Sequence, residues 1–271
     1  MTSARVALVT GAAQGIGKAI ALRLNSDGFA IALSDLPAKR EALEEVAKLI
    51  NSDGGRAAVF TGDVSVEEDV KNMVDGAAEA LGGFHVIVAN AGISIPRSLL
   101  EETSEGFDLQ MAVNARSVFL AFKHAARQIL AQGHREGRLI AACSICGKHG
   151  YTNTAAYSAS KFAIRGITQS AAHELGPHGI TVNAYAPGGI DTEMSERHRP
   201  SVSSFALNHH LPSSRLIGDR PKWMTNSVPV KRIGQPEDIA NLVSYLASKE
   251  ASYMTGQTVS IIQLDDVECM D

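Results

Sequence analysis

The chain has 271 residues, of which 45% are apolar and 20% charged, a balance typical of a globular protein with a substantial core. Its net charge of −4, with scattered basic residues, argues against a nucleic-acid-binding surface. There is no long apolar run and no basic-then-apolar leader, so we expect no membrane span, no secretory signal and a cytoplasmic, reducing location.

Short apolar runs alternate with helical patterns along the chain. The predicted strands span residues 5–10, 29–33, 56–61, 84–89, 138–142, 180–185 and 257–262. The predicted helices run from the glycine-rich loop to residue 24 and over residues 39–50, 66–81, 107–132, 155–175 and 236–247, with Ser65 expected to cap the helix at 66–81. Because the strands are continuously apolar, we predict a doubly wound α/β fold, a parallel sheet with helices on both faces, in one domain over residues 1–271.

A glycine-rich loop follows the first predicted strand. Its spacing is G-x-x-x-G-x-G, with glycines at Gly11, Gly15 and Gly17. Glycines between a buried strand and a helix allow a tight turn and a close approach of backbone to a phosphate. The unpaired N–H groups and the dipole at the start of that helix suit a pyrophosphate. The loop therefore predicts a dinucleotide site.

Asp35 closes the second predicted strand, where an acid would bind the adenosine ribose. A carboxylate accepts hydrogen bonds from ribose hydroxyls and repels a 2′-phosphate, so we expect NAD rather than NADP. Lys39 and Arg40 lie close enough in sequence to favour NADP if Asp35 turned away. The alternative reading of Asp35 is a turn or cap residue.

Tyr157 and Lys161 are four residues apart in a predicted helix and therefore share one face of it. An ammonium near a phenol favours the phenolate, which would lower the tyrosine pKa and make the side chain a proton carrier near neutral pH. Ser144 could hydrogen-bond the same substrate oxygen. By itself Y-x-x-x-K is common in amphipathic helices, and the glycine-rich loop is what favours catalysis.

Cys143 and Cys146 flank Ser144 in a C-x-x-C pattern. A zinc site would need a second pair of ligands at suitable spacing, and the sequence has none. We interpret the two cysteines as small residues lining a pocket, with a redox pair as the alternative.

Residues 193–230 form a long irregular stretch with four prolines and the only tryptophan, Trp223. Because this stretch follows a strand's carboxyl end, we interpret it as a substrate lid, with a solvated insertion as the alternative.

In this order, the motifs resemble those of the short-chain dehydrogenase/reductase family, from Val6 to about Val259. The matching motifs are Thr10-Gly11-x-x-x-Gly15-x-Gly17, Asp63-Val64, Asn90-Ala91-Gly92, Asn114, Ser144, Tyr157-x-x-x-Lys161 and Pro187-Gly188-x-x-x-Thr192. The resemblance implies a seven-stranded Rossmann sheet, a nicotinamide cofactor, a small alcohol or ketone substrate, no metal and a homo-oligomer, a tetramer or a dimer.

The resemblance also implies residue roles. Tyr157 is the acid/base, Lys161 lowers its pKa and holds the nicotinamide ribose, Ser144 orients the substrate oxygen, and Asn114 supports a water chain from Lys161 to solvent. Asn114 could otherwise be a buried structural residue. The cofactor residues are Gly11, Gln14, Gly15, Ile16, Gly17, Asp35, Asp63, Val64, Asn90, Ala91, Gly92, Tyr157, Lys161, Pro187, Gly188, Ile190 and Thr192. The expected substrate contacts are Ser94, Ile95, Ile145, His149, Tyr151 and Gly189, although His149 could equally be a surface residue.

Two short segments, 148–150 and 184–188, are similar to those of acetoin and diacetyl reductases. The chain departs from the family after its last strand, where Asp-Gly-Gly is common and residues 262–265 read Ile-Gln-Leu-Asp. We predict an NAD-dependent oxidoreductase that interconverts a secondary alcohol and a ketone. The alternatives are an NADPH-dependent carbonyl or 3-oxoacyl reductase of fatty-acid or secondary metabolism, and a non-catalytic dinucleotide-binding regulator.

Overall fold

The computed structural model describes residues 4–133, 136–197, 216–217, 220–221 and 230–261. Its strands are β1 (Val6–Thr10), β2 (Ala30–Asp35), β3 (Ala57–Thr61), β4 (Val86–Ala89), β5 (Gly137–Ala142), β6 (Ile180–Pro187), β7 (Leu216–Ile217), β8 (Arg220–Pro221) and β9 (Thr258–Ile261). Its longer helices are α1 (Gly15–Ser26), α2 (Arg40–Ser52), α3 (Glu67–Leu81), α4 (Ser104–Gln110), α5 (Ser117–Ala131), α6 (Ala155–Leu175) and α10 (Pro236–Ala247).

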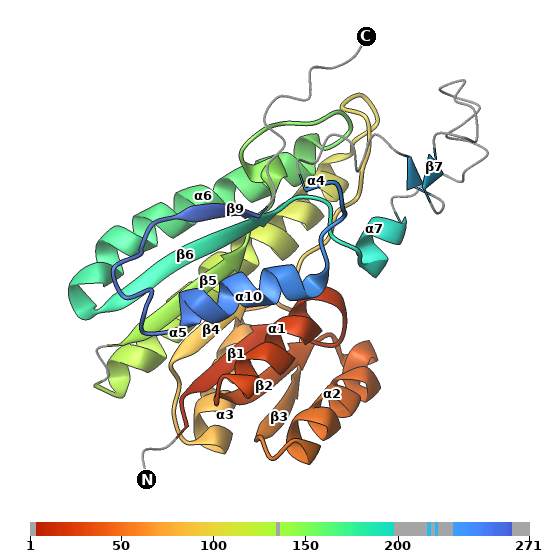
Figure 1. The fold of residues 1–271 in the computed structure, drawn as a ribbon. Coiled ribbons are helices and arrows are strands. Elements are labelled where there is room, and N and C mark those ends of the chain that lie inside the picture. The colour runs from red at the N-terminus through yellow and green to blue at the C-terminus, as the bar shows by residue number, and fades with distance from the viewer. Residues whose placement is uncertain (1–3, 134–135, 198–215, 218–219, 222–229, 262–271) are drawn as a thin grey trace.

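Seven strands form one parallel sheet in the order β3-β2-β1-β4-β5-β6-β9. The chain builds outward from β1 to β3 and then returns to place β4 on the other side of β1 (Figure 1). This reversal is a topological switch point, and ligands of such sheets bind beside it, outside the carboxyl ends of the strands. The predicted single α/β domain with a seven-stranded parallel sheet is confirmed.

Helices cover both faces of the sheet, which explains the continuously apolar strands. Along β1 the side chains alternate, so Val6 and Leu8 join one core cluster while Ala7 and Val9 join the other. The first cluster contains residues of α3, α5 and α6, and the second contains residues of α1, α2 and α10. Strands covered on both faces therefore carry apolar residues at most positions.

The helix predicted over residues 107–132 differs from the observed one. The helical segment begins one turn earlier, at Ser104, where the Thr103 hydroxyl accepts a hydrogen bond from the Gly106 N–H at 3.0 Å. Between α4 and α5 it passes through a π-helical segment, η2 (Met111–Arg116), which contains Asn114. Apolar periodicity cannot reveal a π turn, because the turn adds a single residue to the helix.

The predicted cap at Ser65 is wrong. Helix α3 begins at Glu67 with Val66 as its N-cap residue and no side-chain cap. Ser65 instead donates its backbone N–H to the Asp63 carboxylate at 2.8 Å, so these residues form a turn ahead of the helix.

The predicted lid lies largely outside the described residues. Within residues 193–230, the described parts include the short helix α7 (Glu193–Arg197) and the antiparallel pair β7–β8. Among the described residues, no helix is long and apolar enough to cross a membrane.

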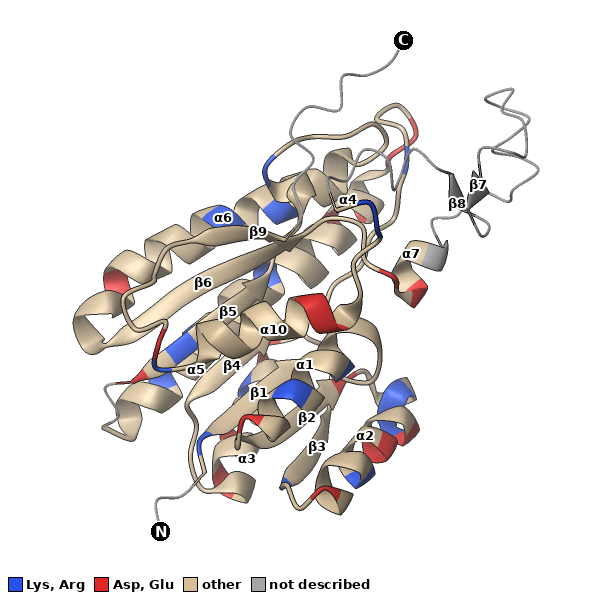
Figure 2. Ribbon diagram, in the orientation of Figure 1, with Lys and Arg blue, Asp and Glu red and all other residues tan. Residues whose placement is uncertain are grey.

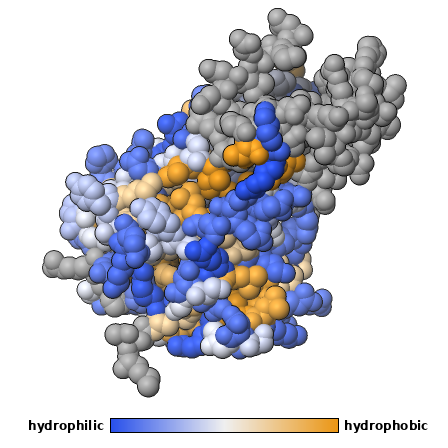
Figure 3. All heavy atoms as spheres, in the orientation of Figure 1, coloured by the Kyte–Doolittle hydropathy of each residue, from blue (hydrophilic) through white to orange (hydrophobic). Residues whose placement is uncertain are grey.

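Acidic and basic residues are interspersed over the described ribbon rather than gathered into one basic face (Figure 2). In the space-filling view, hydrophobic residues form separate patches among hydrophilic ones (Figure 3).

Candidate active site

The glycine-rich loop has the geometry of a phosphate cradle. Gly11 and Gly15 have φ values of +67° and +53°, a backbone region that favours glycine. A Cβ at Gly17 would collide with the Gly11 carbonyl oxygen. Helix α1 starts directly at Gly15, and its N-cap residue Gln14 makes no side-chain cap hydrogen bond. The first N–H groups of α1 can therefore bind a pyrophosphate.

A buried hydrogen-bond network fixes this loop to the neighbouring strands. The Thr10 hydroxyl accepts from the backbone N–H groups of Asn90 and Ala91, each at 3.0 Å. The Asn90 amide donates to the carbonyl of Thr10 at 2.9 Å. The Tyr185 hydroxyl donates to Asn90 Oδ1 at 2.8 Å, and burial raises the pKa of Tyr185, so this phenol stays a donor. Asn90 and Ala91, the first two residues of the Asn90-Ala91-Gly92 motif, thus hold the start of the glycine-rich loop in place through these hydrogen bonds.

Asp35 lies beside the loop at the end of β2. Its Oδ2 accepts a hydrogen bond from the Ala13 N–H at 3.2 Å, and its Oδ1 accepts from the Leu36 N–H at 2.9 Å. The side chain therefore points at the glycine loop while also forming a local turn, so both predicted readings have geometric support. Lys39 also reaches the glycine-rich loop, because its ammonium donates to Gln14 Oε1 at 2.6 Å.

Ser144, Cys146 and Tyr157 meet at the carboxyl end of β5. Ser144 is the N-cap residue of a short 3-10 turn, η3 (Ile145–Gly147), and its hydroxyl accepts from the Cys146 N–H at 3.1 Å. A hydrogen bond from the Ser144 side chain favours the Tyr157 phenolate, but burial outweighs it and raises the pKa of Tyr157. Ser144 and Tyr157 are thus adjacent, as one shared substrate oxygen would require.

Lys161 lies one helical turn after Tyr157, with its ammonium 5.5 Å from the centre of the phenol ring. The side chain is 4% exposed and donates to the Ala142 carbonyl oxygen at 2.8 Å. Burial lowers the pKa of Lys161 to about 8. The expected lowering of the Tyr157 pKa is not seen, because the desolvation of the phenol dominates in this arrangement and the ammonium points at a carbonyl.

Asn114 and Lys161 approach each other across Gly92. A Cβ on Gly92 would lie 3.0 Å from Asn114 Oδ1 and 3.5 Å from Lys161 Nζ. Asn114 is fully buried, accepts from the Ile93 N–H at 2.8 Å, and donates to the Ile93 carbonyl at 2.9 Å and to Ser160 Oγ at 3.0 Å. The Asn114 amide therefore holds the backbone of Ile93 in place, and this role is compatible with a water chain to Lys161.

The remaining cofactor candidates also lie at this edge of the sheet. Thr192 contacts the loop, since a Cβ on Gly15 would lie 3.5 Å from Thr192 Cγ2. Ile190 is buried and forms a parallel bridge with Gly234. The backbone of Asp63 donates to Asp69 Oδ2 at 2.8 Å. Ile16 packs against the core, Val64 is buried, and Pro187 and Gly188 end β6 and follow it.

The residues expected to contact the substrate differ in their solvent exposure. Ser94, Ile95 and Ile145 are partly buried, whereas His149 and Gly189 are exposed. Tyr151 is 37% exposed, and burial together with the neighbouring Cys146 raises its pKa. His149 is therefore at the surface, in keeping with the alternative reading of that residue.

The two cysteines are free thiols in the structure. Burial raises the pKa of both Cys143 and Cys146, which disfavours the thiolate that redox exchange requires. Among the described residues, no cluster of His, Cys, Asp and Glu side chains could hold a metal ion. The Cys146 backbone N–H donates to Ser144 Oγ at 3.1 Å, so this residue lies directly beside Ser144.

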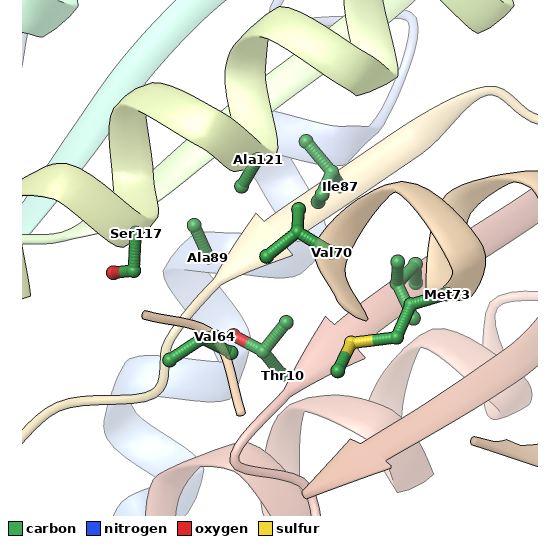
Figure 4. Close-up of a pocket in the computed structure, with 9 residues that line it drawn as sticks. Thr10, Val64, Val70, Met73, Ile87, Ala89, Ser117 and Ala121 are labelled. Atoms are coloured by element: carbon green, nitrogen blue, oxygen red, sulfur yellow. The ribbon is translucent and has the colours of Figure 1, made fainter. Parts of the chain in front are cut away.

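A small internal cavity of about 10 Å³ lies between α3, α5 and the sheet (Figure 4). Its lining is mostly apolar and consists of Leu8, Thr10, Val64, Val70, Met73, Ile87, Ala89, Ser117 and Ala121. The volume is about that of one water molecule. The cavity is a packing void lined by Thr10, which precedes the glycine-rich loop, and its lining includes none of Ser144, Tyr157 and Lys161.

The sequence analysis assigns no role to Tyr185 or Gln110. Tyr185 is hidden because a fully buried tyrosine in a strand normally indicates only a core position. Gln110 is also 0% exposed, and a buried glutamine needs hydrogen-bond partners that the sequence alone does not identify.

Comparisons with known proteins agree with this geometry. A family model described as enoyl-(acyl carrier protein) reductase matches residues 11–261. A short-chain dehydrogenase/reductase of Armillaria gallica is 46% identical over 96% of this chain and 95% of its own length. An L-2,3-butanediol dehydrogenase of Corynebacterium glutamicum is 43% identical over 95% and 96%.

Two further matches extend the comparison. A diacetyl reductase [(S)-acetoin forming] of Staphylococcus epidermidis is 37% identical over 94% of this chain and 96% of its own. The crystal structure of a dehydrogenase/reductase from Sinorhizobium meliloti superposes with a TM-score of 0.82 at 35% identity, covering 95% of this chain and 93% of that one.

Proposed function

The chain belongs to the short-chain dehydrogenase/reductase family, and from this premise we propose that it interconverts a secondary alcohol and a ketone with NAD as the hydride carrier. Oxidoreduction at CH–OH groups with a nicotinamide dinucleotide follows from the family. The observation that carries the finer proposal is the meeting of Ser144, Tyr157 and Lys161 beside the glycine-rich loop and Asp35. This arrangement disfavours the alternative of a non-catalytic regulator.

The nicotinamide would supply or accept the hydride. The residues of this chain would then handle the proton. In ketone reduction, the Tyr157 hydroxyl donates its proton to the carbonyl oxygen as that oxygen gains negative charge. The Ser144 hydroxyl hydrogen-bonds the same oxygen. Because burial raises the pKa of Tyr157, the phenol is protonated at neutral pH, which suits reduction; oxidation needs the phenolate and should accelerate as pH rises.

We expect a vicinal hydroxyketone or diketone as the substrate, since the relatives named butanediol dehydrogenase and diacetyl reductase act on such compounds. The test is a screen of diacetyl, acetoin, butane-2,3-diol and unrelated secondary alcohols, following the absorbance of reduced nicotinamide. Turnover of the vicinal compounds above simple ketones would support the proposal. Turnover of none of these alcohols or ketones with either nucleotide would overturn it.

A second candidate is reduction of the 3-oxo group of 3-oxoacyl thioesters with NADPH. The matching family model is described as an enoyl-(acyl carrier protein) reductase, and Lys39 lies near the ribose end of the site. Activity with 3-oxoacyl thioesters, and tighter fluorescence titration by NADPH than by NADH, would favour this candidate.

Asp35→Ala should shift the nucleotide preference. Removing the carboxylate removes both the hydrogen-bond acceptor for ribose and the charge that opposes a 2′-phosphate, while Lys39 remains nearby. We expect the Kd for NADH to rise about tenfold and the Kd for NADPH to fall, by fluorescence titration. As a control, Asp53→Ala changes an aspartate at the C-cap of α2 and should alter neither value. An unchanged ratio of the two Kd values in Asp35→Ala would contradict the assignment.

We further propose that the chain is a homo-oligomer joined through α4, η2, α5 and α6. A groove there is lined by Glu105, Asp108, Leu109, Met111, Ala112, Ala115, Arg116, Phe119, Ala163 and Ile167. Leu109 and Phe119 are about half exposed, at 47% and 51%. Asp108 and Arg116 stand on the same lining, so a two-fold axis would let the acid of one copy meet the arginine of the other.

Light scattering should therefore give a mass that is a multiple of the chain mass, and Phe119→Glu should give the single-chain mass with the fold retained by circular dichroism. A monomeric wild-type protein would exclude this interface.

A further inference from the structure

Two side-chain amides hold the segment that follows β4. Asn114 accepts from the Ile93 N–H and donates to the Ile93 carbonyl, at 2.8 and 2.9 Å. Gln110, four residues earlier, accepts from the Ile95 N–H at 3.1 Å and donates to the Ile95 carbonyl at 3.4 Å. Because an amide side chain has the donor and acceptor of a peptide group, each residue pairs with the segment as a neighbouring strand would.

This pairing fixes the register of the segment. In extended backbone, the N–H and C=O of one residue point to the same side, and those of the next residue point to the opposite side. The N–H and C=O of Ile93 both pair with Asn114, and those of Ile95 both pair with Gln110, so both residues face the helical segment that carries these amides. A shift by one residue would break both pairs at once.

The segment also spans the catalytic group. At its start, Gly92 lies against Lys161, since a Cβ on Gly92 would be 3.5 Å from Lys161 Nζ. Further along, the Arg97 N–H donates to the Asn153 carbonyl at 3.0 Å, in the loop just before the helix that carries Tyr157. Ser94 and Ile95 therefore lie between two points that are fixed to the surroundings of Tyr157 and Lys161.

Gln110 has a further anchor of its own. Its amide also donates to Glu102 Oε2 at 3.4 Å, and the other Glu102 oxygen lies 3.7 Å from Arg97 Nη1. Within the described part of the chain, the Gln110 side chain hydrogen-bonds residues 95 and 102 rather than the glycine-rich loop. Its contacts are therefore on the substrate side of the site.

We propose that Gln110 is a positioning residue of the substrate site: its amide fixes residues 93–95 so that Ser94 and Ile95 are presented to the substrate beside Tyr157. The inference deepens the proposed alcohol–ketone activity and rests on it. Gln110 touches neither substrate nor dinucleotide in this role, so its loss should affect substrate recognition and leave cofactor binding intact.

The chain offers a matched control at the far end of β4. There Gln132 accepts from the Phe84 N–H at 2.9 Å and donates to the Phe84 carbonyl at 3.5 Å, the same two-point pairing away from the catalytic group. Gln110→Met and Gln132→Met each remove one such pairing with little change in side-chain volume. Comparing the two variants distinguishes the general effect of losing such a pairing from the specific effect of losing the pairing between Gln110 and Ile95.

With diacetyl and NADH as probes, Gln110→Met should raise the KM for diacetyl about tenfold, the cost of one buried hydrogen-bonded contact, while kcat changes less than about threefold. The Kd for NADH should stay within about twofold, and Gln132→Met should leave all three values unchanged. Hydrogen–deuterium exchange of the peptide containing residues 93–95 should increase in Gln110→Met alone.

An unchanged KM in Gln110→Met, equal losses in both variants, or a parallel rise in the NADH Kd would each overturn the inference. If the wild-type enzyme reduces no ketone, the proposed function fails by itself, and exchange at residues 93–95 still decides whether Gln110 holds the segment.

If Gln110→Met does not fold, Gln110→Glu replaces it. A protonated carboxyl group keeps the two-point pairing, whereas its ionised form repels Glu102 despite Arg97, so the KM should rise with pH in this variant only.

Discussion

Tyr157→Phe should abolish turnover while leaving dinucleotide binding nearly intact. The substitution removes one hydroxyl group, the atom assigned to pass a proton to the substrate oxygen, and keeps the ring that packs near Lys161. Positioned proton transfer contributes about 10²- to 10⁴-fold to rate, so we expect kcat to fall by about 10³-fold or more. The measurement is steady-state reduction of the best ketone from the screen, at saturating NADH.

The controls for Tyr157→Phe use the same protein. Fluorescence titration should give an NADH Kd within about twofold of wild type, because the ring is retained. Tyr253→Phe removes the hydroxyl of a fully exposed tyrosine that is not among the expected site residues, and it should keep the activity. A Tyr157→Phe enzyme that retains wild-type turnover would mean that another group carries the proton.

The fold was predictable because two signals agreed along most of the chain. Continuous apolar runs such as Val6–Thr10 identified strands buried on both faces, and glycine at positions 11, 15 and 17 identified the turn into α1. The membership of the family and the parallel seven-stranded sheet are both confirmed. The π turn around Asn114 was not predictable, because it adds a single residue to the helix and leaves no signal in the apolar periodicity.

For the site, the sequence could predict which residues gather but not their protonation. The spacing of Tyr157 and Lys161 was enough to place both on one helix face. The pKa of each depends on burial, which raises that of Tyr157 and lowers that of Lys161, and burial is a property of the whole fold. Tyr185 and Gln110 act through Asn90 and Ile95, partners that are distant in sequence or lie in a loop without periodicity.

Lys161→Met should reduce activity as strongly as Tyr157→Phe, through a different path. The ammonium is the assigned holder of the nicotinamide ribose and the cation nearest the phenol, so its loss should lower kcat about 10³-fold and also raise the NADH Kd, which Tyr157→Phe does not.

The pKa of Lys161 is lowered to about 8 by burial, so its charge is present below that pH and is lost as pH rises through it. The pH profile of wild-type ketone reduction should accordingly have a limb near pH 8 that falls with rising pH, and the Lys161→Met profile should lack this limb. Added methylamine should restore part of the lost rate in Lys161→Met and none in Tyr157→Phe. A falling limb that persists unchanged in Lys161→Met would assign it to another group, and a wild-type rate in that variant would leave the buried ammonium without a part in the reaction.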